Sequence, residues 1–455
     1  MQQENLFPVA ASGRAIDAAG AAGDAAGGPR PAPRLRRADR SQVRLRSCAL
    51  DDLLPDDHPA RVVWAAVGRL DLSAFADPIR SRGDAPGRAA TDPRLLVSVW
   101  LYAYTEGVSS GRRAADLCDA DTGHAAYQWL CGGVTVNYHT LNDFRVNHRD
   151  ALDELFTQVL GRLTHARPVR VERITQDGTK VRANAGSGSF GARGTLERHL
   201  ADARDHVAAL GRLGDEAPAA ASARQRANQD RAAADRLGRL TRAMDELAKV
   251  EAAKAGQKDK PSKHKPAKAS ATDPEARMQK MPDGGYRPAY NVQFAQDPAS
   301  RAIVGVAVAP DSSDKNQAEA MRRQVEERTG GKVVEHVVDG NYVALGEIDR
   351  AAEQGVTVYA PVPKAKAAGQ DRFAPRKTDT PAVAEWRARM NTPEGREAYR
   401  DRARTCETVN ADLKTHRGLG PTLPGRGAGK VLCAALWSAL AYNLLHFGAA
   451  LLALA

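Results

Sequence analysis

Apolar residues recur at helical spacing through residues 45 to 165. In DPRLLVSVWLYAYTEGV, Leu95, Leu96, Val99 and Tyr102 fall on one side of a helix. The preceding segment PDDHPARVVWAAVGRL begins with Pro and acidic residues, which suit a helix start. Shorter segments with Gly and Ser breaks follow: SSGRRAADLCD, AAYQWLCGG and NYHTLNDFRVNHRDALDELFTQVL. The pattern therefore predicts an all-α N-terminal domain at 45–165.

The pattern changes after residue 166, where apolar runs alternate with amphipathic helical segments. YNVQFAQD and AIVGVAVAP predict a hairpin, and SDKNQAEAMRRQVEERTG predicts a helix. KVVEHVVDGNYV, YVALGEIDRAAEQG and VTVYAPV then predict strand, helix and strand. Because both hairpin and helical connections join these strands, we predict an α/β domain with a mixed sheet at 166–455. Residues 364 to 395 are predicted to be an irregular connection.

A helical insertion at about 190–272 interrupts this domain. Apolar residues at spacings of three and four, from Leu196 to Leu210 and from Leu237 to Leu247, predict two helices of a hairpin. The insertion ends in KAGQKDKPSKHKPAKAS, which holds six lysines. This segment is either a mobile basic tether that lies along DNA phosphates or a solvated linker.

The two ends of the chain need separate interpretations. Residues 1–44 are rich in Ala, Gly, Pro and Arg and lack the apolar core of a secretory signal, so we predict a disordered arm. The segment at about 430–455 is apolar enough to suggest a membrane span. Polar side chains interrupt it, however, and would need internal partners in lipid: Trp437, Ser438, Tyr442, Asn443 and His446. We therefore predict a buried C-terminal helix and no membrane partner.

The balance of charge indicates an anionic partner. The formal net charge is +11, and the excess is spread over many Arg and Lys, which suits a phosphate backbone better than a membrane anchor. The five cysteines are scattered without CxxC spacing, so neither a disulfide framework nor a zinc site is indicated. These features predict a cytoplasmic protein that binds nucleic acid.

Three acidic residues stand in contexts that predict one shared site. Asp177 in VERITQDGTKVRAN and Asp339 in KVVEHVVDGNYV each follow a strand-like run, and Gly comes next. Glu407 lies in the helical stretch YRDRARTCETVNADLK, on the same face as Lys414. Three carboxylates are what two Mg²⁺ (or Mn²⁺) ions about 4 Å apart require. Taken singly, however, Asp-Gly is typical of a turn and Glu407 of a solvated helix surface.

At these residues the chain resembles the DDE transposases of bacterial insertion sequences. Tyr399, Arg402, Glu407 and Lys414 follow the order of that family's Tyr-Arg-Glu-Lys signature helix at closely similar spacing. Four further blocks occur in the family's order: DGTKVRAN, GGYRPAYNVQFAQD, DSSDKNQ and VVDGNYV. The resemblance spans roughly residues 45 to 450. Two positions depart from it: Cys406 precedes the glutamate, and Asn341 stands where Gly is usual, although Asn tolerates a positive φ.

The resemblance implies an RNase H-like catalytic domain with the helical hairpin inserted, preceded by the all-α domain. Its metal ligands and catalytic residues would be Asp177, Asp339 and Glu407, which hold two Mg²⁺ (or Mn²⁺) ions. It further implies a transposase that cuts and joins double-stranded DNA, acting as a homodimer at insertion-sequence ends in the nucleoid. Two alternatives remain: a non-catalytic DNA-binding remnant, and a metal-dependent nuclease without strand transfer.

Six basic or aromatic residues are the predicted DNA contacts. Tyr399, Arg402 and Lys414 would contact phosphates beside the scissile bond, unless they form ordinary ion pairs on a helix surface. Arg112, Arg113 and Arg145 lie in the N-terminal domain. That domain is either a helix-turn-helix-like module or a helical packing domain with a basic surface, and the resemblance favours DNA contact.

Overall fold

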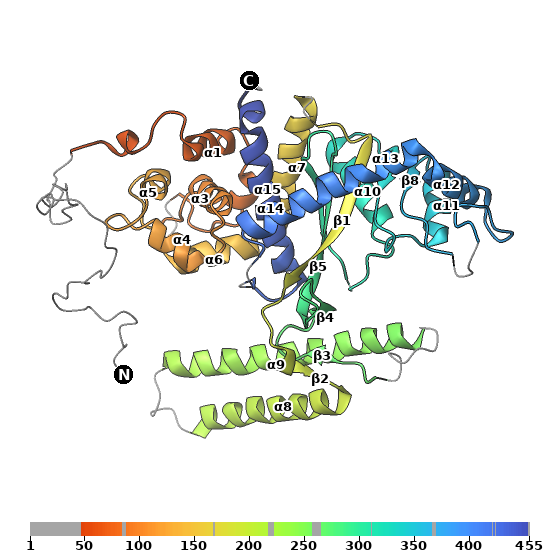
Figure 1. Cartoon of the computed structure of the whole chain (residues 1–455). Helices are drawn as coiled ribbons and strands as arrows, with labels where there is room; N and C mark the ends of the chain where they lie inside the picture. Colours follow the sequence, from red (N-terminus) through yellow and green to blue (C-terminus); the bar gives the residue numbers. More distant parts are fainter. Residues whose placement is uncertain are drawn as a thin grey trace, which may run out of the picture. The chain divides into compact units, whose positions relative to one another are not determined.

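The computed structural model describes residues 47–453 except 84–87, 167–168, 217–222, 257–264, 311, 366–369, 421 and 424. The predicted arm at 1–44 lies outside the described residues, as do Lys258, Lys260 and Lys263 of the lysine segment. Cys48–Ala455 forms one compact unit (Figure 1).

The N-terminal part is helical, as predicted. Its elements are η1 (Leu50–Leu53), α1 (Pro59–Val67), α2 (Ser73–Ala76), α3 (Pro93–Thr105), α4 (Gly111–Leu117), α5 (Ala125–Cys131), α6 (Tyr138–Asn147) and α7 (Arg149–His165). Helix α3 starts where the sequence signals a start: Pro93 is its first residue, and the Asp92 carboxylate accepts a hydrogen bond from Arg94 N at 2.8 Å. Every residue from Leu95 to Thr105 is buried, so α3 is a core helix.

The α/β part is built on a mixed sheet, which confirms the predicted mixed α/β class. Within the described residues this sheet has six strands: β1 (Arg173–Arg182), β4 (Arg277–Lys280), β5 (Tyr286–Gln296), β6 (Ile303–Val308), β7 (Glu335–Val337) and β8 (Thr357–Tyr359). The order is β4-β5-β1-β7-β8, and β6 also pairs with β5. Strand β5 is antiparallel to β4, β6 and β1, whereas β1, β7 and β8 are parallel.

Helices connect and cover these strands. They are α10 (Ala318–Thr329), α11 (Leu345–Glu353), α12 (Pro381–Asn391), α13 (Pro393–Arg402), the π-helical turn η3 (Ala403–Glu407) and α14 (Thr408–His416). The irregular connection predicted at 364 to 395 is wrong in part, because it contains α12. Thr380 caps this helix, and the Arg387 guanidinium and Asp379 carboxylate form a buried ion pair at 2.7 Å. Charged residues are frequent in this segment, and the sequence alone does not indicate that two of them form a buried ion pair.

The insertion contains the two predicted helices, α8 (Arg193–Glu216) and α9 (Ala223–Ala255), which pack against each other (Figure 1). Leu196, Leu240 and Leu247 are buried between them. Two short paired strands, β2 (Phe190–Gly191) and β3 (Ala269–Ser270), join the hairpin to the sheet after the 3₁₀ turn η2 (Ser187–Ser189). An ion pair between Glu246 of α9 and Arg277 of β4 fixes the hairpin on the sheet side.

The C-terminal helix α15 (Ala428–Ala453) is long and apolar enough to cross a membrane, but most of its apolar window is buried inside the protein. It packs against α1, α3, α6, α7 and β6. Three of its polar side chains have internal partners. Trp437 donates to the Arg145 carbonyl oxygen and Ser438 to the Arg417 carbonyl oxygen, while the Asn443 amide bonds both the N–H and the C=O of Ile303 in β6. Helix α15 thereby joins the N-terminal helices and the sheet in one core.

Candidate active site

Asp177 lies within strand β1, not at its end. The strand continues to Arg182, and Asp177 pairs with Phe294 of β5, so the expectation that the strand ends at Asp177-Gly178 is wrong. Close packing, rather than a turn, accounts for glycine at position 178. A Cβ there would lie 2.5 Å from Asp314 Oδ1 and 2.6 Å from Asn291 Oδ1. Gly178 therefore gives a polar loop close access to the strand beside Asp177.

Asp339 follows β7 directly, at the carboxyl end of a strand as predicted. Its Oδ1 accepts a hydrogen bond from Gly340 N at 2.7 Å. Asn341 does not use the positive φ that its identity allowed, because Arg301 and Asn316 are the non-glycine residues with positive φ in the described chain. Its side-chain amide instead donates to Asp339 Oδ2 at 3.4 Å. Asn341 thus bonds the carboxylate rather than merely permitting a turn.

A single guanidinium faces both aspartates. Arg402, the last residue of α13, lies 2.8 Å from Asp177 Oδ1 and 3.9 Å from Asp339 Oδ2. Burial raises the pKa of Asp177; Arg402 opposes this shift, and the charges of Asp339 and Asp314 reinforce it. Burial acts to lower the pKa of Arg402, but attraction to Asp177 and Asp339 outweighs it, so that pKa stays raised. The structure therefore concentrates negative charge around one cation.

The segment after Arg402 is aligned with β1 by its π-helical turn. An α-helix turns about 100° per residue, so Arg402 and Asn410 would differ by about 80°, and the extra residue of a π-turn removes most of that offset. Asn410 Nδ2 lies 3.4 Å from Asp177 Oδ2. Burial lowers the pKa of Lys414, an effect that Asp177 opposes and Lys180 reinforces. Arg402, Asn410 and Lys414 therefore share the face directed at Asp177.

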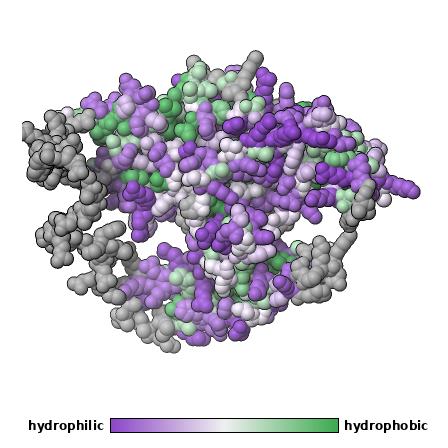
Figure 2. Space-filling view, in the orientation of Figure 1, coloured by the Kyte–Doolittle hydropathy of each residue, from purple (hydrophilic) through white to green (hydrophobic). Residues whose placement is uncertain are grey.

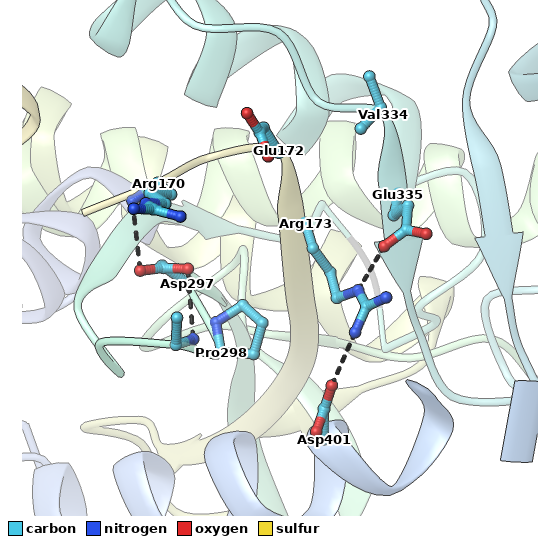
Figure 3. Close-up of a pocket in the computed structure, with 9 residues that line it drawn as sticks. Arg170, Glu172, Arg173, Asp297, Pro298, Val334, Glu335 and Asp401 are labelled. Carbon is cyan, nitrogen blue, oxygen red and sulfur yellow. Dashed lines mark hydrogen bonds and ion pairs between the residues drawn. The ribbon is translucent and has the colours of Figure 1, made fainter. Parts of the chain in front are cut away.

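Cys406 and Arg173 hold this helical segment on the sheet. The buried Cys406 Sγ contacts Gln296 Oε1 at 3.0 Å, and burial raises the pKa of this thiol to about 12. Arg173 of β1 pairs with Glu335 of β7 and, at 3.0 Å, with Asp401 of α13 (Figure 3). Arg173, Glu335 and Asp401 line a cavity of about 560 Å³, and none of the three predicted metal ligands lines it. The cavity is therefore an anchoring region, separate from the aspartates.

Glu407 is on the same helical segment but faces solvent. It ends the π-turn, one turn before Asn410, and in the described part of the chain its carboxylate makes no hydrogen bond or ion pair. Correspondingly, no group of three or more His, Cys, Asp or Glu side chains among the described residues is arranged to hold a metal ion. The structure brings Asp177 and Asp339 together, whereas the role of Glu407 stays a prediction.

Sequence reasoning missed Asp314, although it lies in the DSSDKNQ block. Its Oδ1 accepts hydrogen bonds from Asn291 at 2.7 Å and from Gln293 at 2.9 Å. Gln293 Oε1 in turn accepts a hydrogen bond from the Tyr342 hydroxyl, three residues after Asp339. This network joins β5 to the loops that carry Asp314 and Asp339. The sequence signal was an acidic residue in a polar block between two predicted elements.

Two family models match parts of the chain. The transposase domain (DUF772) matches residues 48–147, and the transposase DDE domain matches residues 364–447. These two matches support a DDE transposase of the insertion-sequence type. No curated protein and no solved structure matches it. The second match covers the segment from Tyr399 to Lys414, and the first covers most of the N-terminal helices.

The transposase's predicted N-terminal DNA contacts differ in exposure. Arg112 and Arg113 are exposed on α4, and the Arg112 guanidinium lies 5.1 Å from the centre of the Tyr138 ring. Arg145 is only 4% exposed; it donates to the Ser109 carbonyl oxygen and stacks on Trp100. A buried guanidinium cannot reach a phosphate in this structure. The prediction of a DNA contact is therefore withdrawn for Arg145 and kept for the other two.

Proposed function

We propose that this transposase binds the ends of an insertion sequence and catalyses metal-dependent cleavage and strand transfer. The observation that carries the proposal is the pairing of Asp177 and Asp339, from neighbouring parallel strands, around one cation. Carboxylates on adjacent strands are held in fixed geometry, which a site for phosphodiester chemistry needs. The protein would act in the cytoplasm on nucleoid DNA.

We infer that the catalytic region is RNase H-like. The support is its sheet, in which antiparallel β6, β5 and β1 adjoin parallel β1, β7 and β8. Asp177 is on the first strand of this sheet along the chain, Asp339 follows the fifth, β7, and Glu407 is on a later helical segment. The hairpin α8–α9 is inserted between the first and second of these strands.

The residues around Arg402 fit a divalent cation. Asp177 and Asp339 offer hard oxygen ligands, and burial raises the pKa of Asp177 although Arg402 opposes the shift, so a divalent cation there would stabilise the charged carboxylate. We propose that Asp177, Asp339 and Glu407 hold two Mg²⁺ (or Mn²⁺) ions. Such ions supply a Lewis acid for phosphodiester cleavage and transfer.

The remaining side chains of the segment would position DNA. Lys414 is half-buried, and no ion pair to it exists among the described residues, so its ammonium is available to a phosphate. Tyr399 is half-buried beside Arg402, and burial raises the pKa of its hydroxyl, which therefore stays protonated as a hydrogen-bond donor. Arg402, released from the aspartates by a metal ion, would offer a bidentate fork to a phosphate.

The test uses DNA that carries the element's own ends. Asp177→Asn and Asp339→Asn should each reduce cleavage about a thousandfold, because a metal site worth several kcal/mol is removed. Both variants should bind the ends normally in a gel shift, since DNA affinity resides mainly in basic contacts. Glu407→Gln tests the third ligand in the same way. Near-normal cutting by any one variant would remove that residue from the site.

The same assay separates the alternatives. A nuclease without strand transfer would give cut ends and no joined product in the presence of target DNA. A non-catalytic remnant would shift the DNA and leave it intact with either metal ion. Sizing of the protein–DNA complex tests the proposed homodimer, which predicts two protein chains per paired complex.

A further inference from the structure

A second basic site lies away from the aspartates, where the helical hairpin meets the sheet. A cavity of about 310 Å³ is lined by His199, Arg236, Arg239, Leu240, Ala271, Thr272 and Arg426. The basic groups come from α8, from α9 and from the loop before α15. Buried Leu240 belongs to the hairpin's own core, so packing between the two helices fixes one wall of the cavity.

The arginines of this cavity lack carboxylate partners. Neither Arg236 nor Arg239 makes an ion pair within the described chain, and Asp235 does not bond Arg239 despite its favourable spacing of four residues. Arg426 donates through Nε to the Asn184 carbonyl oxygen. Asp273 attracts Arg426, but it is buried and bonded to Tyr290 and to Gly427 N, and it does not line the cavity.

Some other basic residues on or beside the hairpin are paired. Arg193 bridges Glu251 and Glu197, while Lys249 and Arg277 share Glu246. The unpaired arginines therefore do not reflect a shortage of acidic residues on these helices. Like charges gathered in one concave site repel each other unless an anion joins them, and guanidinium groups match phosphate oxygens in shape and charge.

We propose that this cavity binds a backbone phosphate of double-stranded DNA, so that the insertion helices hold the duplex beyond the end of β1. This inference rests on the proposed function, since it takes DNA as the substrate. Arg236 and Arg239 are the principal contacts, and Arg426 provides a third from the opposite wall. The surface over α8 and α9 is mostly hydrophilic, as such a contact requires (Figure 2). The contact is to backbone only and carries no sequence preference.

The test compares two double variants of the full-length transposase. In Arg236→Gln/Arg239→Gln, the slope of log affinity against log salt for a duplex of mixed sequence should fall by about 0.9, because the contact to one phosphate is lost. The matched control is Arg231→Gln/Arg242→Gln, which removes the same charge from exposed positions of α9 outside the cavity. The control should keep the wild-type slope.

The outcomes separate this inference from the proposed function. No DNA binding by the wild type would overturn both, whereas wild-type binding with equal slopes in the two variants would overturn the inference alone. A pyrophosphate thermal shift that is lost in Arg236→Gln/Arg239→Gln, with the DNA slope unchanged, would indicate a site for free anions and also overturn it. Arg426→Gln, on another element, should lower the slope by up to about 0.9, the value for that same phosphate, and it tests the site even if the double variant does not fold.

Discussion

Arginines in two regions of this transposase have opposite surroundings. At the aspartate pair, Arg402 is 12% exposed and faces two carboxylates. In the hairpin cavity, Arg236 is exposed and Arg239 is half-buried, and neither forms an ion pair with a carboxylate of the described residues. The chain has a formal charge of +11, yet this excess says nothing about which guanidinium meets DNA. Pairing and burial decide that question, and both are properties of the fold.

We expect the largest change in stability on substitution of Arg402. Arg402→Gln leaves two carboxylates facing each other in a partly buried site, so the free energy of unfolding should fall by about 3 kcal/mol without metal. Mg²⁺ or Mn²⁺ should then raise the melting temperature of this variant more than that of the wild type, because the ion replaces the missing charge. Differential scanning fluorimetry with and without metal measures both effects.

Arg404→Gln is the matched control for that experiment. Arg404 lies two residues further along and is exposed, with an ion pair of 2.9 Å to Glu397. Exposed pairs of this kind contribute at most about 1 kcal/mol, so the control should be close to the wild type and indifferent to metal. Equal losses in the two variants would contradict the role of Arg402 as an internal counter-ion.

A second contrast lies within the N-terminal helices. Arg145→Gln should lower the free energy of unfolding by about 2 kcal/mol, because it removes a buried donor from the Ser109 carbonyl and a cation from Trp100. Arg112→Gln should change stability by less than about 0.5 kcal/mol but lower the salt slope of DNA binding by about 0.9. Denaturant unfolding and binding titrations on the same variants measure the two effects. A lower salt slope of DNA binding for Arg145→Gln would instead indicate that Arg145 contacts DNA.

A buried histidine gives the site region a pH dependence. His336 in β7 is fully buried; burial and then the charge of Arg322 hold its pKa well below the usual value. The Arg322 guanidinium donates to Nδ1 at 3.2 Å, so the neutral ring carries its proton on Nε2. The unfolded chain takes up a proton near pH 6.5 and the folded chain does not. Stability should therefore be retained above that pH and fall below it, by up to about 1.4 kcal/mol per pH unit.

His336→Gln tests this dependence through the slope rather than the absolute stability. Between about pH 6.5 and 5, the free energy of unfolding in urea should depend less steeply on pH in the variant, by the slope that uptake of one proton contributes. His139→Gln, at an exposed position of α6, should keep the wild-type slope. An unchanged slope for His336→Gln would mean that another group controls acid unfolding.

Local pattern predicted the elements well, and the reasons are physical. Each segment of α1, α3, β5 and β7 carries its own periodicity and its own cap or turn signal, so neighbouring residues suffice to identify it. The errors arise where distant parts decide. Asp177-Gly178 looks like a turn, but β5 pairs with β1 through this dipeptide and Asp314 occupies the space that a side chain would need.

The candidate site was predictable in composition but not in arrangement. The strand contexts of Asp177 and Asp339 indicated two of its members. Nothing local distinguishes Arg402, which faces those carboxylates, from Arg404, which faces Glu397, because the π-helical turn that sets their directions is not encoded by any simple period. The burial of Arg145 depends likewise on long-range packing with α15, whose Trp437 donates to the Arg145 carbonyl.

We expect the smallest effect when a negative charge, that of Asp314, is removed instead of a positive one. Asp314 raises the pKa of Asp177, although burial is the larger cause. Asp314→Asn keeps an oxygen acceptor for Asn291 and Gln293 while it removes the charge, so the pKa of Asp177 should fall. The acid limb of the pH profile for DNA cleavage should then move to lower pH, by less than about one unit. Asp314→Ala, which also leaves two amides without their acceptor, should instead lose stability by about 1 to 3 kcal/mol. A pH profile identical to the wild type in Asp314→Asn, with stability preserved, would show that Asp314 supports the loop alone and does not act on Asp177.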